Sequence, residues 1–507
     1  QRKHAQERPQ NAPSASLHTD CWRVCIPAQN ALTVSGPFCC VLVAWAIDCL
    51  HEFREFIRKV RRQSVRFRKT RHLTMMGLGS AIGAGLFLGT GVGIKAAGPA
   101  VLLAYIIAGA IVVCVMRMLG EMAAARPASG SFSTYGEMAF GRWAGFSTGW
   151  LYWFLLVMVM GAEMTGAAEL MGHWFGIPAW IPALVCVVLF AVINLAQVGG
   201  FGEFEFWFAF VKVAVIIFFL VVGVLLIFGL LPGHSAVGLD NFIGKSGFMP
   251  NGIPGVAAGL LAVAFAFGGI EIITIAAAES ENPTSSIAVA VRSVIWRISL
   301  FYLGSVLVIC FLLPYDQING AESAAESPFT IILRMAHVPA IVGFMEAVIV
   351  LALLSAFNAQ IYATSRLCRS LSQRGDAPRL FATTNSQGVP INAVLLSMFF
   401  AFVSVGLQYW NPPGLLNFLL NAVGGCLVVV WLMICFSYLK LHPEMEQEGN
   451  VSVRMWGYPW LPWLTIISIL ALIALMLSDP GSRSQVTSVA IVFAFLVALS
   501  FIPRKVA

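Results

Sequence analysis

Three ionisable residues lie inside long apolar stretches of this sequence. Lys212 is in FWFAFVKVAVII, Glu163 is in MGAEMT, and Glu271 follows a glycine pair in FAFGGIE. An apolar environment disfavours charge, so each residue either exchanges a proton or holds a charged partner. Glu163 has no basic residue one helical turn away, which favours a cationic ligand or a proton as its partner. For Lys212 the alternatives are a fixed ion pair or extension of the side chain to a polar surface.

Glycine is concentrated in two apolar segments. The first, MGLGSAIGAGLFLG, covers residues 76–89, and the second is the FAFGGIE segment. Glycine is a poor helix former, so both segments are expected to interrupt their helices and to expose backbone N–H and C=O groups. The alternative is close packing of helices through small residues spaced four apart. The candidate binding residues are Ser80, Ala81, Gly83, Ala84, Gly85, Glu163, Phe265, Phe267, Gly268, Gly269 and Glu271.

The elements that position these residues follow from the composition. Of 507 residues, 59% are hydrophobic and 11% are charged, whereas a soluble domain carries roughly 25% charged residues. Apolar stretches of about 20 residues, enough for a helix to cross the ~30 Å hydrocarbon core, recur along the chain. They are apolar on every face, which excludes a barrel of alternating strands. The predicted fold class is an all-α membrane protein with about 12 transmembrane helices, at residues 73–95, 98–120, 144–172, 179–198, 204–231, 253–279, 287–313, 339–365, 391–409, 414–438, 459–477 and 485–503.

Basic residues predict the orientation of these helices. If the N-terminus is cytoplasmic, most Lys and Arg residues fall in cytoplasmic loops, and the run RKVRRQSVRFRK before the first span strengthens that bias. Both termini are therefore predicted on the cytoplasmic side of the inner cell membrane. The predicted organisation is a disordered extension at residues 1–70, a transmembrane domain at 71–503 and a tail at 504–507.

Several other classes of function are disfavoured. The net charge of +7 is spread over loops instead of one face, so a nucleic-acid partner is not predicted. The eleven cysteines show no metal-binding spacing, and no nucleophile, histidine and acid constellation occurs. We predict neither a metal nor another cofactor, and no enzymatic activity. No sequence feature indicates an oligomeric state.

The two glycine-rich breaks are separated by five membrane crossings, so the two helices run in opposite directions. Such a pair is typical of inverted repeats with a binding site near the middle of the membrane. Helix N-termini at the breaks offer N–H groups to a carboxylate, and released carbonyls can accept hydrogen bonds from an ammonium group. A small amino acid has both groups. Ser355 and Asn358, in the predicted span 339–365, are further pocket candidates, or they join helices to one another.

A series of motifs gives the sequence a family resemblance. Residues 76–89 and the segments RMLGEMA, GSFSTY, GEFEFW and AESENP resemble the amino acid permeases of the amino acid–polyamine–organocation superfamily, in order over about residues 70–503. Within it, GRWAG, IAAAES, SVIWRIS, QRGDAP and RMWGYPW are most similar to bacterial 4-aminobutyrate (GABA) permeases.

The resemblance implies a LeuT-like fold of two inverted five-helix repeats plus two C-terminal helices. It also implies uptake of an amino acid, with 4-aminobutyrate first, together with protons by alternating access. Lys212 would carry the coupling proton, and Glu271 would link substrate binding to gating and proton coupling. Some relatives have Ser or Thr at the position of Ala84, so the first break would depend more on backbone groups here. The alternatives are a permease for proline, aromatic amino acids or D-Ala, Ser and Gly, an amino acid exchanger, and a passive channel.

Overall fold

The structure is a computed structural model that describes residues 82–503 except 129, 196–200, 232–234, 244–246, 270, 273, 275–282, 319–326, 336–338, 386–387, 450–452 and 479. The chain divides into two units, Gln1–Lys59 and Val60–Ala507. Every described residue belongs to the second unit. The predicted extension at residues 1–70, the tail at 504–507, and the candidate residues Ser80 and Ala81 lie outside the described part.

The described residues form helices and contain no strand. Because their side chains are apolar around the whole circumference, the long helices suit a lipid environment in which all backbone hydrogen bonds are made within the helix. The main elements are η1 (Gly85–Gly89), α3 (Thr90–Ala97), α4 (Val101–Ala125), α5 (Ser131–Phe140), α6 (Arg142–Phe175), α7 (Trp180–Leu195), α8 (Phe201–Ile227), α10 (Gly252–Ala266), α12 (Pro283–Trp296), η3 (Arg297–Leu303), α13 (Gly304–Leu312), α14 (Pro328–Met335), α15 (Pro339–Gln373), α16 (Ile391–Trp410), α17 (Leu415–Gln447), α18 (Trp460–Ser478) and α19 (Pro480–Ser500). Short turns η2 (Gly98–Ala100), α9 (Asp240–Ile243), η4 (Tyr315–Gln317) and η6 (Arg379–Phe381) connect some of them.

The helices agree with the predicted spans. Eight segments of the described chain are long and apolar enough to cross a membrane, and the segment Gly85–Ala125 includes both α3 and α4. Three shorter apolar helices, Trp180–Leu195, Gly252–Ala266 and Leu300–Leu312, fall on three other predicted spans. The predicted all-α membrane fold is therefore confirmed.

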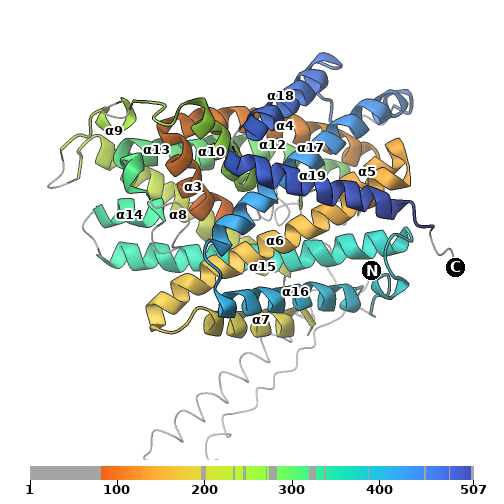
Figure 1. Cartoon of the computed structure of the whole chain (residues 1–507), viewed down its shortest axis with the longest axis horizontal. Helices are drawn as coiled ribbons and strands as arrows, with labels where there is room; N and C mark the ends of the chain where they lie inside the picture. The colour runs from red at the N-terminus through yellow and green to blue at the C-terminus, as the bar shows by residue number, and fades with distance from the viewer. Residues whose placement is uncertain are drawn as a thin grey trace, which may run out of the picture. The chain divides into compact units, whose positions relative to one another are not determined.

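Helix α6 occupies a central position and carries both Tyr152 and Glu163. It packs along α15 and α17 and also contacts α5, α7 and α19, and Figure 1 shows it crossing α15. Helix α10 packs against α3, α4 and α17, while α7 and α16 lie side by side. This arrangement brings the two glycine-rich segments together with the middle of α6.

Candidate functional site

The first glycine-rich segment contains an irregular turn whose N-terminal end is held by a carboxylate. Glu163 of α6 is 3% exposed, and its Oε1 and Oε2 accept hydrogen bonds from the Ala84 N–H at 3.1 and 3.0 Å. The N–H groups of Leu86 and Phe87 both reach the Gly83 carbonyl, at 3.2 and 3.1 Å. The carboxylate thus caps the start of a helical segment, where backbone N–H groups and the helix dipole favour negative charge.

The turn that follows is of the wide, π-helical type, over Gly85–Gly89. Such turns release the regular hydrogen bonding of a helix and are frequent at functional sites. The hydroxyl of Ser327, just before α14, donates a hydrogen bond of 2.7 Å to the Phe87 carbonyl. The ring of Phe87 also lies edge-on to Phe329, at 5.1 Å between centroids. The interrupted segment is therefore fixed from two sides, by α6 and by the start of α14.

The second glycine-rich segment ends α10. The Phe267 N–H bonds to the Ala264 carbonyl at 3.1 Å and the Gly268 N–H bonds to the Phe265 carbonyl at 2.8 Å, which tightens the last turn. Gly269 then adopts a φ of +87°, a conformation that residues with a Cβ rarely take. The helical hydrogen bonding of α10 thus stops one turn before Glu271, as its glycine pair predicts.

Glu271 is completely buried and is held by two neutral donors from other helices. The Trp431 Nε1–H of α17 bonds to Oε1 at 3.0 Å, and the Tyr152 hydroxyl of α6 bonds to Oε2 at 3.3 Å. The Tyr152 ring is in turn fixed edge-on against Phe132, with centroids 4.6 Å apart. Because a buried carboxylate needs donors to replace water, this pair of contacts ties the second break to both α6 and α17.

The two breaks lie directly against each other. A Cβ atom added to Gly85 would lie 2.7 Å from the Ala266 Cα, and one added to Gly89 would lie 3.2 Å from the Phe265 Cδ1. A Cβ on Gly83 would collide with the Glu163 carboxylate. Glycine is thus required for close approach, and both predicted roles of these glycines, interruption and tight packing, apply together.

Lys212 lies on α8 and is completely buried. Lys212 is near enough to Glu163 for its charge to act on that carboxyl group. The apolar sequence around Glu163 concealed its hydrogen-bond partner, the Ala84 N–H. The lysine's complete burial argues against its extension to a polar surface.

The other predicted pocket residues divide into two groups. All four are buried: Phe265, Phe267, Ser355 and Asn358. Phe267 joins an aromatic cluster, with its ring centroid 5.9 Å from Tyr105 and 5.2 Å from Tyr302. Asn358 accepts a hydrogen bond of 2.9 Å from the Asn194 side chain of α7. Phe267 and Asn358 thus have the contacts of packing residues, and for Asn358 this was the alternative considered.

Comparison with known proteins gives the family of the chain. The profile of the family described as "Amino acid permease" matches residues 72–504. The chain belongs to the amino acid permease family. It is 74% identical over 435 residues to the aromatic amino acid transport protein AroP of Corynebacterium glutamicum, covering 86% of this chain and 94% of that protein.

Other, less similar relatives of this permease are named for gamma-aminobutyric acid. It is 42% identical over 396 residues to the gamma-aminobutyric acid permease of Bacillus subtilis, covering 78% of this chain and 84% of that protein. For the gamma-aminobutyric acid permease of Escherichia coli the identity is 42% over 425 residues, covering 83% and 91%. A crystal structure of a manganese transporter mutant from Eremococcus coleocola has the same fold, with a TM-score of 0.52, 15% identity, and coverage of 85% of this chain and 92% of that one.

The family assignment establishes a multi-pass membrane protein that transports amino acids and is not an enzyme. The predicted superfamily and fold class are therefore correct. Three residues of this permease were not identified from the sequence. Tyr152 and Trp431, the donors to Glu271, resemble any other residue of an apolar helix when only the sequence is considered. The third is the buried carboxylate Glu121.

Glu121, on α4, is completely buried and is surrounded by donors. It accepts hydrogen bonds from the Tyr438 hydroxyl at 3.0 Å and the Met455 N–H at 2.6 Å, and it contacts His442 Nδ1 at 2.8 Å. Its position in the RMLGEMA motif of an apolar span was the signal that could have identified it. These contacts join α4, α17 and the segment before α18 at one end of the helices.

Proposed function

We propose that this permease imports aromatic amino acids by proton symport. The identity of 74% to a protein named for aromatic amino acid transport, over 86% of this chain and 94% of that protein, supports this substrate class. The predicted substrate, 4-aminobutyrate, is the second candidate. It is supported by two relatives named for that compound, at 42% identity.

The observation that supports this substrate site is the contact between the two glycine-rich breaks, which lie beside the buried carboxylates of Glu163 and Glu271. The N–H group of Ala84 is the kind of donor that a substrate carboxylate requires, and Glu163 occupies it. A substrate carboxylate therefore competes with Glu163 for this donor. Protonation of Glu163 removes its charge and weakens its hold on the N–H group, because hydrogen bonds to ionised acceptors are the stronger ones.

This competition links substrate binding to a proton. Lys212 interacts electrostatically with Glu163, so the charge of either residue affects the protonation of the other. In this mechanism a proton taken up by the pair releases the Ala84 N–H group, and the substrate carboxylate binds it. Glu271, held by Tyr152 and Trp431, then transmits the occupancy of the site to α6 and α17 through its hydrogen bonds.

The proposed setting is the cytoplasmic cell membrane, with both termini on the cytoplasmic side. The distribution of Lys and Arg in the sequence supports that orientation. The proposed partners are therefore an aromatic amino acid, protons and the surrounding lipid.

The test is uptake by the purified, full-length permease in liposomes. Radiolabelled phenylalanine, tyrosine, tryptophan and 4-aminobutyrate are each supplied with and without an inward proton gradient. We expect gradient-stimulated uptake of the three aromatic substrates and at least tenfold slower uptake of 4-aminobutyrate. A tenfold difference in affinity corresponds to about 1.4 kcal/mol of binding free energy. Faster 4-aminobutyrate uptake would reverse the substrate assignment. Counterflow that does not depend on the gradient would indicate an exchanger, and non-saturable flux a channel.

A pair of lysine variants tests the coupling. Lys212→Met removes the ionisable group while keeping a long apolar side chain, and Lys440→Met, at an exposed position of α17, is the matched control. We expect the first variant to lose gradient stimulation and the second to keep it. Full gradient dependence in Lys212→Met would contradict the proposed role of this lysine.

A further inference from the structure

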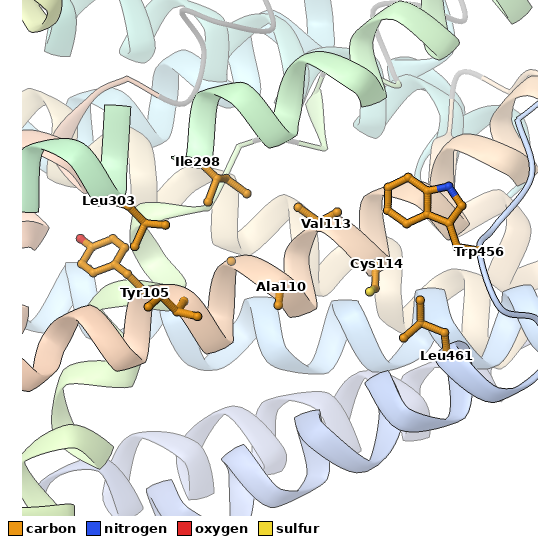
Figure 2. Close-up of a pocket in the computed structure, with 10 residues that line it drawn as sticks. Tyr105, Ala110, Val113, Cys114, Ile298, Leu303, Trp456 and Leu461 are labelled. Carbon is orange, nitrogen blue, oxygen red and sulfur yellow. The ribbon is translucent and has the colours of Figure 1, made fainter. Parts of the chain in front are cut away.

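An apolar groove of about 370 Å³ runs along α4. Its lining includes Tyr105, Ala110 and Val113 of α4, Ile298 of η3, and Trp456 and Leu461 at the other end (Figure 2). The Tyr105 hydroxyl is already hydrogen-bonded to Thr90, at 3.1 Å. The lining is therefore suited to a hydrocarbon chain and not to an amino acid.

The groove opens at membrane depth. It follows α4, a membrane-spanning helix, and Ile106 on its wall is 53% exposed. From Tyr105 to Cys114 the helix rises roughly 13 Å. This length is close to half of the ~30 Å hydrocarbon core, which is the depth of one lipid leaflet.

One end of the groove carries basic residues. The Arg117 guanidinium lies over the Trp456 ring, 4.1 Å from its centroid, and its Nε–H donates a hydrogen bond of 2.8 Å to the Arg454 carbonyl. The charge of Glu121 acts on Arg117 more strongly than the like charge of Arg292 does, and both Arg292 and Arg454 are exposed. The nearest carboxylate on α4, that of Glu121, interacts with Arg117 but also holds Tyr438 and Met455.

This end is the one that the distribution of basic residues predicts to face the cytoplasm, at the level of the lipid headgroups. Guanidinium groups that repel one another there are stabilised by a phosphate anion, which arginine binds with paired hydrogen bonds. Trp456 marks the same level, because tryptophan is enriched where hydrocarbon meets headgroups. The apolar groove and the basic end together match the two parts of one molecule.

We propose that this groove binds an anionic phospholipid, with an acyl chain along α4 and the phosphate group on Arg117, Arg292 and Arg454. The lipid bridges α4, η3 and the segment before α18. Occupancy requires both parts of the site, so blocking the apolar part or removing one of the charges lowers it. The proposal does not depend on which amino acid the permease transports.

The experiment is native mass spectrometry of the full-length permease taken from nanodiscs of equal amounts of phosphatidylcholine and phosphatidylglycerol. Ala110→Phe fills the groove from an exposed position, and Val188→Phe, at a residue of α7 that is 45% exposed, is its control. Arg454→Gln removes one charge, and Arg379→Gln, at an exposed position of η6, is its control. Measured uptake by each variant confirms that it is folded.

We expect the wild-type protein and both controls to retain phosphatidylglycerol in preference to phosphatidylcholine. Ala110→Phe should lose retained lipid of both kinds, while Arg454→Gln should lose about fivefold of its preference for phosphatidylglycerol, the effect of one basic residue near an anionic membrane surface. Equal retention in all five proteins would overturn the proposal. So would equal retention of the two lipids by the wild type.

The same spectra distinguish other occupants of the groove. If a second copy of the chain filled it, Ala110→Phe would change the oligomeric state without changing lipid retention. That result would overturn the assignment to a lipid.

Discussion

Replacing Gly85 with alanine places a methyl group against the backbone of α10 at the contact between the two breaks. The added Cβ would lie 2.7 Å from the Ala266 Cα and 3.2 Å from its carbonyl oxygen, whereas ordinary contacts begin at 3.4 Å. The two segments must therefore separate by about 0.7 Å. Overpacking of this kind costs about 1–3 kcal/mol.

The cost applies only to conformations in which the breaks are this close. If transport requires this arrangement, a penalty of about 1–3 kcal/mol lowers its population about 5- to 150-fold relative to conformations in which the segments are apart. We expect the initial uptake rate of Gly85→Ala, per mole of reconstituted protein, to fall at least fivefold. The midpoint of thermal unfolding in detergent should fall as well, because the close contact is part of the folded state.

Two variants make the test specific. Gly406→Ala adds the same methyl group on α16, where no described atom outside the helix lies within 4 Å of the new Cβ, and it should behave as wild type. Adding Ala266→Gly to Gly85→Ala should not restore uptake, because the collision is with backbone atoms. Uptake by Gly85→Ala at the rate of Gly406→Ala, with an unchanged unfolding midpoint, would refute the close approach of the two breaks.

Three further predictions follow from the hydrogen bonds of the site. Glu163→Ala removes the cap on the Ala84 N–H and should lower the free energy of unfolding by about 1–2 kcal/mol, whereas Glu163→Gln keeps an acceptor; equal thermal unfolding midpoints for the two variants would contradict the capping role. Trp431→Phe removes the shorter of the two hydrogen bonds to Glu271 and should reduce uptake more than Tyr152→Phe does, in the same liposome assay; the reverse order would argue against the observed geometry. Asn358→Ala should cost about 0.5–1.5 kcal/mol of stability through loss of its partner on α7, with the order of substrate preference unchanged in competition assays; an altered order would instead place this side chain in the pocket.

Much of the fold could be predicted because the membrane imposes strong local rules. A helix that spans hydrocarbon needs a long apolar run, so the described helices coincide with the predicted spans. The glycine pair before Glu271 likewise predicted the end of α10, since the +87° φ of Gly269 is a local property of the chain. Ionisable residues in apolar runs are few, so Lys212, Glu163 and Glu271 were identifiable from their surroundings alone.

The partners of those residues were decided by tertiary structure. Glu163 bonds to the Ala84 N–H, 79 positions away in the chain, and Glu271 bonds to Trp431, 160 positions away. No periodicity within one helix indicates which donor of another helix will face a given carboxylate, because that depends on how the helices cross. The sequence by itself thus determined the membrane fold, the breaks and the buried charges. Only the packing of α6, α10 and α17 decided that one carboxylate caps the first break while the other is held by an indole and a phenol.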